Sequence, residues 1–161
     1  TNKDLQFAQD NTRILSGLYG LLRPMDLIMQ YRLEMGTKLK TNKGACLHNF
    51  WSTFISKLLN DELVSHEKSI IINCASVEYF KAVNMSTLKA EVVTPVFKEI
   101  RNGKPRIISF FAKRARGAMA RYIITNQIND IDGIISFDMD NYAYNESLSS
   151  RYEPVFTRYS A

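Results

Sequence analysis

The chain has 161 residues, of which 45% are hydrophobic and 23% are charged, and its formal net charge is +5. This length and composition exclude a disordered or fibrous chain and predict one soluble domain with a core of its own. The excess of Lys and Arg favours anionic partners.

The first half of the chain predicts helices that alternate with short strands. A helix over 3–11 precedes a strand near 12–16, and a loop with Gly and Pro follows. YRLEMG at 31–36 alternates in polarity like a strand. A core helix from about 45 to 60 then carries apolar residues at helical spacing, namely Leu47, Phe50, Trp51, Phe54, Ile55 and Leu58.

The second half continues the alternation. SIIINCA at 69–75 predicts a buried strand, and a helix from Ser76 to about Asn84 follows it. Residues 90–100 and 105–111 predict a hairpin around Asn102-Gly103, the strongest short-range hairpin signal in the chain. The remaining predicted elements are a basic helix in 110–124 and two strands, GIISF at 133–137 and EPVFTRY at 153–159.

This order predicts an α/β fold. We expect a mixed β-sheet with flanking helices, in which a β-hairpin leads into a basic helix. Repeats and low-complexity segments are absent from the sequence.

The basic helix FFAKRARGAMARYII at 110–124 is the most informative segment. No Asp or Glu occurs between Glu99 and Asp130. At about 100° per residue, Arg114 and Arg121 lie opposite an apolar arc, with only Gly117 and Ala118 between them. Such a surface predicts phosphate binding, whereas the alternative is a solvated basic face with Gly117 under a crossing helix. The cations of this stretch are Arg101, Lys104, Arg106, Lys113, Arg114, Arg116 and Arg121.

Two segments in the first third of the chain are further sites of interest. In LSGLYGLLRP at 15–24, Gly17 and Gly20 permit a tight turn that exposes backbone N–H groups to phosphate. This segment is similar to the hairpin of DNA-binding helix-hairpin-helix elements, but a tight turn at the exit of a strand is the favoured interpretation. In 31–36, Arg32 and Glu34 share one face if the segment is extended, which predicts a buried ion pair.

NCASVEYFKAV at 73–83 is the candidate catalytic segment. Asn73 and Ser76 lie at the end of a buried strand, a position where α/β sheets bind ligands, and Glu78 could act as a general acid/base whose pKa is set by Lys81. The favoured interpretation is structural, with Ser76 as a helix cap and Glu78 paired with Lys81.

Metal and nucleotide sites have little support in the sequence. The two histidines, His48 and His66, have no companion at a metal-ligand spacing, and neither a Walker A nor a GxGxxG motif is present. We expect no cofactor and no dedicated iron site.

The expected compartment is the cytoplasm. No apolar run approaches the ~20 residues of a membrane span, and no signal-peptide pattern opens the chain. Cys46 and Cys74 form no CxxC motif and are too few for a disulfide framework. We expect no membrane contact, and no pattern indicates the oligomeric state.

Four segments together resemble the YaaA peroxide-stress family of bacteria: residues 15–36, HNFW at 48–51, 73–83 and 110–124. The resemblance implies a cytoplasmic protein, induced by hydrogen peroxide, that limits iron-dependent damage. It also implies DNA binding through a basic cleft and a helix-hairpin-helix element. Family members carry an N-terminal Ser-Pro-Ala-Lys-Thr strand that this chain lacks, so we expect the chain to be roughly the C-terminal two thirds of a longer protein and to bind less well alone.

Two functional hypotheses follow. The favoured one is a DNA-binding stress protein that contacts phosphate with little sequence preference through Lys113, Arg114, Arg116 and Arg121, with Arg23 and Arg32 as second contacts. The alternative is an enzyme that acts on a nucleoside or nucleobase in a strand-end pocket, and it is the less favoured. Its candidate residues are Glu34, Asn73, Glu78 and Lys81.

Overall fold

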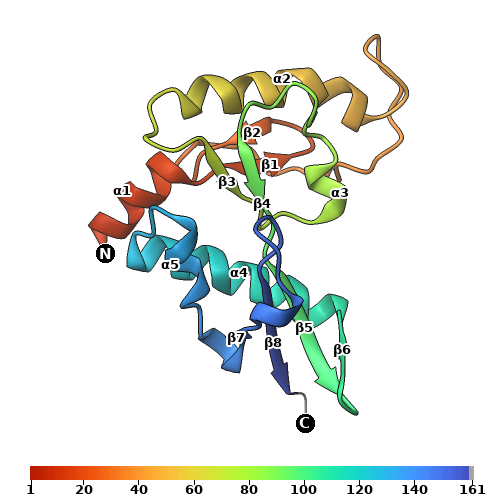
Figure 1. Cartoon of the computed structure of the whole chain (residues 1–161). Coiled ribbons are helices and arrows are strands. Elements are labelled where there is room, and N and C mark those ends of the chain that lie inside the picture. The colour runs from red at the N-terminus through yellow and green to blue at the C-terminus, as the bar shows by residue number, and fades with distance from the viewer. Residues whose placement is uncertain (160–161) are drawn as a thin grey trace. The chain divides into compact units, whose positions relative to one another are not determined.

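The computed structural model describes residues 1–159, which form two compact units (Figure 1). The first unit contains residues 1–69 and 75–90, and the second contains residues 70–74 and those from Glu91 onward. Helices and short strands of mixed orientation occur together, so the predicted α/β class is confirmed. The single domain stays a prediction. In the described part of the chain, every helix is too short or too polar to span a bilayer.

The first unit contains three helices and one β-hairpin. The predicted helices at its start and centre are confirmed, although Phe54 is 48% exposed and lies outside the core. Leu47, Ile55 and Leu59 of the long helix are buried. The elements are α1 (Asn2–Asn11), β1 (Ile14–Ser16), β2 (Gly20–Leu22), α2 (Leu47–Leu63) and α3 (Val77–Phe80).

Two glycines allow the β1–β2 hairpin to pack closely. A Cβ on Gly17 would lie 2.3 Å from the Leu33 carbonyl oxygen, and one on Gly20, whose φ is +77°, would lie 2.7 Å from the Trp51 ring. The Trp51 indole also donates to the Gly17 carbonyl at 2.9 Å. Residues 15–24 thus form a tight turn between strands, and their comparison with a helix-hairpin-helix element is wrong because no helix flanks the turn on either side.

Three other expectations in this unit are corrected. Residues 31–36 form no strand, and Arg32 and Glu34 are both exposed and make no ion pair with each other. The Glu34 carboxylate accepts a hydrogen bond from Tyr79 instead, at 2.7 Å. The helix after Ser76 has only four residues, with the Ser76 hydroxyl capping the Tyr79 N–H as predicted.

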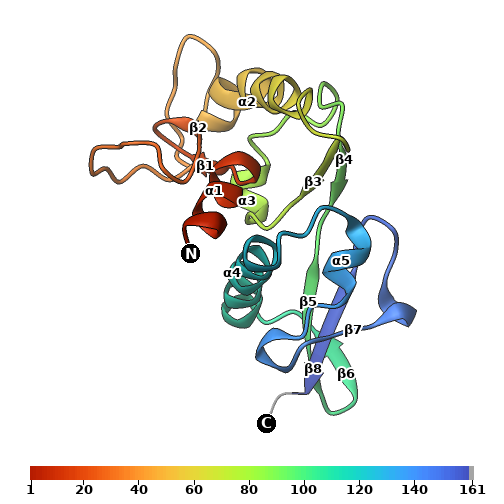
Figure 2. The same cartoon turned by 90° about the vertical axis from the view of Figure 1, so that its left-hand side faces the viewer.

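The second unit contains two sheets and two α-helices (Figure 2). The larger sheet has the strand order β6-β5-β8-β7, in which only β5 and β8 are parallel, and this is the predicted mixed sheet. The elements are β3 (Ile70–Ile72), β4 (Glu91–Val93), β5 (Val96–Arg101), β6 (Lys104–Arg106), α4 (Ser109–Asn126), α5 (Ile131–Ile135), the 3-10 turns η1 (Met139–Asn141) and η2 (Glu146–Leu148), β7 (Ala143–Tyr144) and β8 (Val155–Tyr159).

Strand prediction succeeded in part in the second unit. The Asn102-Gly103 turn joins β5 to β6, and both residues have positive φ, as the predicted hairpin requires. The expected strand over 90–100 is divided near Pro95, so that β4 pairs with β3 and β5 enters the larger sheet. GIISF at 133–137 was wrongly predicted as a strand: α5 covers most of it, because the Asp130 side chain caps the Gly133 N–H and starts a helix.

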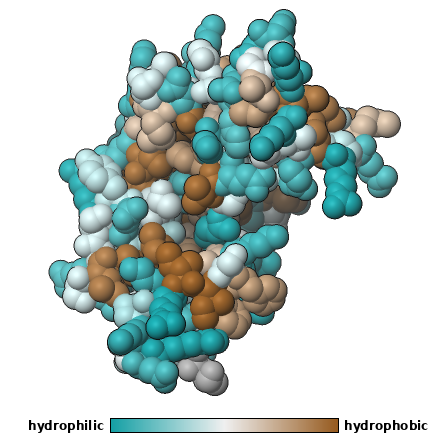
Figure 3. Space-filling model, turned by 90° about the vertical axis from the view of Figure 1, so that its right-hand side faces the viewer, coloured by the Kyte–Doolittle hydropathy of each residue, from teal (hydrophilic) through white to brown (hydrophobic). Residues whose placement is uncertain are grey.

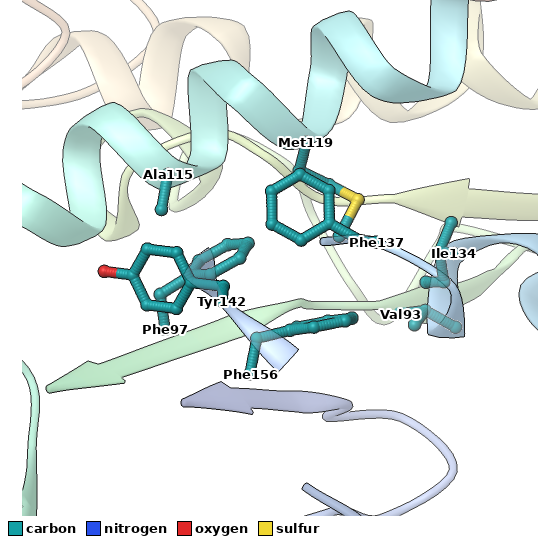
Figure 4. Close-up of a cluster of buried hydrophobic side chains, with 8 residues drawn as sticks. All are labelled: Val93, Phe97, Ala115, Met119, Ile134, Phe137, Tyr142 and Phe156. Atoms are coloured by element: carbon teal, nitrogen blue, oxygen red, sulfur yellow. The ribbon is translucent and has the colours of Figure 1, made fainter. Parts of the chain in front are cut away.

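Packing of α4 on the larger sheet forms the core of this unit (Figure 4). Ala115 and Met119 point from α4 toward Phe97 of β5 and Phe156 of β8, whose rings stack at 5.4 Å. All four side chains are at most 2% exposed. The cluster is completed by Val93, Ile134, Phe137 and Tyr142.

A buried carboxylate lies at the edge of this core. Glu99 is 1% exposed, and its Oε1 accepts from the Tyr142 hydroxyl at 2.5 Å and from Arg158 Nε at 2.8 Å. The Arg158 guanidinium also lies over the rings of Tyr142 and Phe111, at 4.6 and 4.9 Å. Burial of the charged Glu99 carboxylate costs free energy, so we expect the Arg158 cation beside it to be essential for stability.

We predict that Arg158→Met lowers the free energy of unfolding by about 3 to 5 kcal/mol, because a buried carboxylate loses its cation. Glu99→Gln in the same chain should recover part of this loss, because a neutral amide is less costly to bury. Urea denaturation of the wild type and the two variants measures both effects. Equal losses in the single Arg158 variant and the double variant would show that the charge of Glu99 is not what Arg158 compensates.

Candidate nucleic-acid interface

The rotation of α4 is fixed by its apolar arc. Ala115 and Met119 are buried, and Ala112, Tyr122 and Ile123 pack against the same cluster, as the helical spacing predicted. The opposite side of the helix therefore faces solvent. At about 100° per residue, five exposed residues share that side within a 100° arc, and we call them the α4 stripe: Phe110, Lys113, Arg114, Gly117 and Arg121.

Gly117 lies at the centre of the α4 stripe. A Cβ built on it has no heavy atom within 4 Å, so no helix or loop of the described chain covers it. The alternative that a crossing element requires this glycine is therefore wrong. Ala118, which was expected to lie between Arg114 and Arg121, packs against the core instead.

Phe110 adds an apolar side chain to the stripe. It is 72% exposed, and nearby Ile107 is 62% exposed. Figure 3 shows that apolar and polar side chains are interspersed over one face of the molecule. Exposed apolar residues are common on protein surfaces, so Phe110 alone does not identify a ligand.

Arg114 has an acidic partner that the local sequence does not show. Its Nε lies 3.2 Å from Asp140 Oδ2, although the Arg114 side chain is still 70% exposed. Asp140 has a φ of +55°, and its carbonyl accepts from Arg158 at 3.0 Å. The absence of Asp and Glu between Glu99 and Asp130 thus does not leave Arg114 without an acidic partner. In the described residues, Lys113 and Arg121 form no ion pair.

Arg116 lies outside the stripe. It is half-buried, its Nε donates to the Ala112 carbonyl at 3.4 Å, and its charge acts on Cys74. Burial raises the pKa of the Cys74 thiol to about 11, and Arg116 opposes part of that rise. Arg116 is therefore less available to an external anion than the other three cations.

Arg23 and Arg32, the expected second contacts, belong to the first unit. Arg23 Nε lies 3.5 Å from Asp26 Oδ1, within a turn that Asp26 also closes by accepting from the Arg23 backbone. Arg32 is exposed and, within residues 1–159, has no carboxylate partner.

Residues of the alternative enzyme site are largely engaged in structural contacts. Glu78 Oε1 accepts from the Gly36 N–H at 2.9 Å, and His48 Nε2 lies 2.7 Å from the Glu78 carbonyl oxygen. The expected pair of Glu78 with Lys81 is absent from the ion pairs of the described chain. Asn73 belongs to the second unit, where it contacts Thr94 at 3.3 Å.

Tyr79, beside Glu78, has a strongly raised pKa. Its hydroxyl donates to Glu34 at 2.7 Å, and this hydrogen bond, together with burial and the Glu34 charge, raises the pKa of Tyr79 to about 12. A phenol with that pKa holds its proton at neutral pH, so it acts here as a donor to Glu34 and links the 31–36 segment to α3. Over residues 1–159, no cluster of three or more His, Cys, Asp or Glu side chains is arranged to hold a metal ion.

Asp140 and Phe110 were not named from the sequence. Phe110 was detectable, because it lies three and four residues before Lys113 and Arg114 and hence on their side of the helix. Asp140 was not, because it reaches Arg114 only through the fold of η1 onto α4.

Comparison with known proteins places this chain among bacterial proteins of one family. The chain matches the model of a family described as "Peroxide stress protein YaaA" over residues 1–148. A UPF0246 protein of Shewanella denitrificans is 54% identical over 154 residues, which cover 96% of this chain and 60% of the relative. UPF0246 proteins of Shewanella oneidensis and Saccharophagus degradans are 52% and 51% identical over 158 residues, 98% of this chain and 62% of each relative. The chain thus spans about three fifths of the length of these curated relatives.

We predict that Cys74 is inert to hydrogen peroxide at neutral pH. With a pKa of about 11, only about one thiol in ten thousand is ionised at pH 7, and the thiolate is the form that reacts. In a Cys46→Ser variant, the rate of Cys74 alkylation should rise about tenfold per pH unit toward pH 11. Unfolding in urea removes the burial and should accelerate the reaction; equal rates in folded and unfolded protein would contradict the prediction.

Proposed function

The chain belongs to the family of the peroxide stress protein YaaA, and from this premise we propose that it binds DNA through the phosphate backbone in the response to hydrogen peroxide. The family supports the role in peroxide stress. We assign DNA contact to the α4 stripe in the second unit, and we place the activity in the cytoplasm, where bacterial DNA lies.

The observation that carries this proposal is the α4 stripe itself. Three exposed cations, Lys113, Arg114 and Arg121, surround a glycine with open space above it, on a helix that contains no acidic residue. Glycine in a helix interior costs about 1 kcal/mol relative to alanine. Because no contact within the described chain requires Gly117, close approach of an external ligand is a physical reason for it.

Backbone contact suits these residue types. The planar guanidinium groups of Arg114 and Arg121 can each donate two hydrogen bonds to one phosphate, and Lys113 adds a point charge. Such contacts position a protein on DNA and carry no sequence information. We therefore propose binding with little sequence preference, with the α4 stripe as one wall of the basic cleft that the family resemblance implies.

The turn between α4 and α5 is less suited to phosphate. These are consecutive helices joined by residues 127–130, an arrangement that a helix-hairpin-helix element would require. However, Asp130 and Asp132 lie at the start of α5, and the Asp130 carboxylate already accepts from the Gly133 N–H. Like charge would repel a phosphate there, so we assign the contact to the stripe.

Phosphate contact also offers a link to iron. Cations condense on DNA phosphates, and a protein that neutralises these phosphates with Arg and Lys releases the condensed cations. A ferrous ion held at a phosphate would be released in the same way, which would move peroxide-driven radical formation away from the DNA. In this proposal the protein limits iron-dependent damage without binding iron itself.

We predict that Arg114→Ala and Arg121→Ala each weaken binding to unrelated duplex sequences by similar factors. Each change should also flatten the slope of log affinity against log salt by about one, because one phosphate contact is lost. Lys57→Ala is a matched control, since Lys57 is an exposed cation on α2 in the first unit. Fluorescence anisotropy over a salt series measures the slopes, and wild-type slopes in both arginine variants would show that the stripe is only a solvated face.

A second prediction separates binding from stability. Gly117→Ala and Gly117→Met should each raise the free energy of unfolding by up to about 1 kcal/mol, since both residues favour a helix more than glycine does. Only the methionine is long enough to block the space between Arg114 and Arg121, so only Gly117→Met should weaken DNA binding. A methionine variant that is stabilised and binds DNA as tightly as wild type would refute contact at this position.

A further inference from the structure

Along strand β5, one face of the larger sheet changes from buried to exposed side chains. Side chains alternate across a strand, so Phe97, Glu99 and Arg101 of β5 share the face that α4 covers. The first of these joins the aromatic core, and the second is the buried carboxylate. Arg101, the last, lies beyond the core and is exposed. The strand therefore runs from the core to a charged hairpin end.

At that end two cations lie directly opposite each other. The β5–β6 register pairs Arg101 with Lys104 on either side of the Asn102-Gly103 turn. Like charges at directly opposed positions of an antiparallel pair destabilise it. Neither residue forms an ion pair with any carboxylate in the part of the chain that the structure describes. The repulsion is therefore not relieved by the residues around it.

The geometry of the turn keeps the two cations in place. Asn102 and Gly103 have φ values of 51° and 71°, the conformation of a tight two-residue hairpin turn, so the end of the hairpin is not a long loop that could separate them. A Cβ on Gly103 would meet nothing within 4 Å, so the tip is open to an external molecule.

Protection of a sheet edge explains only part of this arrangement. Strand β6 is an edge strand, and Lys and Pro at such positions prevent pairing with other chains, which accounts for Lys104 and Pro105. It does not account for Arg101, because β5 is an inner strand, with β6 on one side and β8 on the other. A carboxylate at position 101 would protect the edge equally and would also attract Lys104.

We infer that Arg101 and Lys104 at the tip of the β5–β6 hairpin form a second phosphate contact for nucleic acid, separate from the α4 stripe. This inference rests on the proposed function and extends it to a second element of the same unit. A bound phosphate between the two cations converts their mutual repulsion into attraction for a shared anion. The hairpin tip and the stripe then contact different phosphates of one DNA backbone.

The test compares charge variants of the full chain. Arg101→Gln with Lys104→Gln removes both cations, and Arg101→Glu replaces repulsion by an opposite-charge pair. Lys57→Gln with Lys68→Gln removes two exposed cations of the first unit and controls for net charge. Binding to a labelled duplex of mixed sequence is measured over a salt series, and Tm is measured at low and high salt.

Relative to the control, the double Gln variant should lower the slope of log affinity against log salt by about one, because the two cations share one phosphate and each phosphate contact contributes about 0.9. Arg101→Glu should bind still more weakly and yet raise Tm by about 1 to 3 °C at low salt, with a smaller rise at high salt. This combination of weaker binding and greater stability would not result from damage to the fold.

Other outcomes overturn the inference. If the hairpin variants keep the wild-type slope while Arg114→Ala flattens it, the hairpin contact is wrong and the proposed function stands. If no variant and no wild-type protein shows salt-dependent binding, the proposed function fails and the hairpin contact fails with it. A fall in Tm for Arg101→Glu would show that the two cations do not repel each other, which removes the reason for an anion at the tip.

Discussion

Burial of Ala115 and Met119 against Phe97 and Phe156 sets the orientation of α4, and the proposed interface depends on that orientation. Once the apolar arc of a helix packs on the core, the geometry of the helix determines which residues face solvent. The charges of the α4 stripe are secondary to this choice, since the ion pair of Arg114 with Asp140 is exposed. The core therefore holds these cations toward solvent, and the proposed interface depends on side chains that carry no charge.

The sequence predicted the elements whose structure depends on residues close together in the chain. The basic helix and the Asn102-Gly103 hairpin were predictable because apolar periodicity and turn chemistry act within a few residues. GIISF failed because an apolar run of five fits a strand or a helix, and the choice was made by the Asp130 cap just before it. YRLEMG failed because alternation predicts a strand only where a neighbouring strand pairs with it, and none does so in the described chain.

Site prediction was limited by contacts between distant segments. The cations of α4 were visible in the sequence, but which of them face solvent was not fully determined: Arg116 lies on the flank beside Cys74. Glu78 was expected to pair with Lys81 on a helix that continues to about Asn84. The helix α3 ends at Phe80, before Lys81. Its actual partner, the Gly36 N–H, is 42 residues away in the sequence, a separation at which spacing rules carry no information.

The Asp140 carboxylate beside Arg114 has a consequence for selectivity among anions. Any anion that approaches Arg114 competes with a carboxylate that is already in place and is held by the fold of η1. A lone phosphate or mononucleotide would contact Arg114 alone, so it would bind there little better than the Asp140 carboxylate does. A polymer engages several cations at once, so its later contacts form at high effective concentration. In the proposed function, the Asp140 carboxylate therefore favours a polyanion, which contacts several cations, over a small anion, which contacts one.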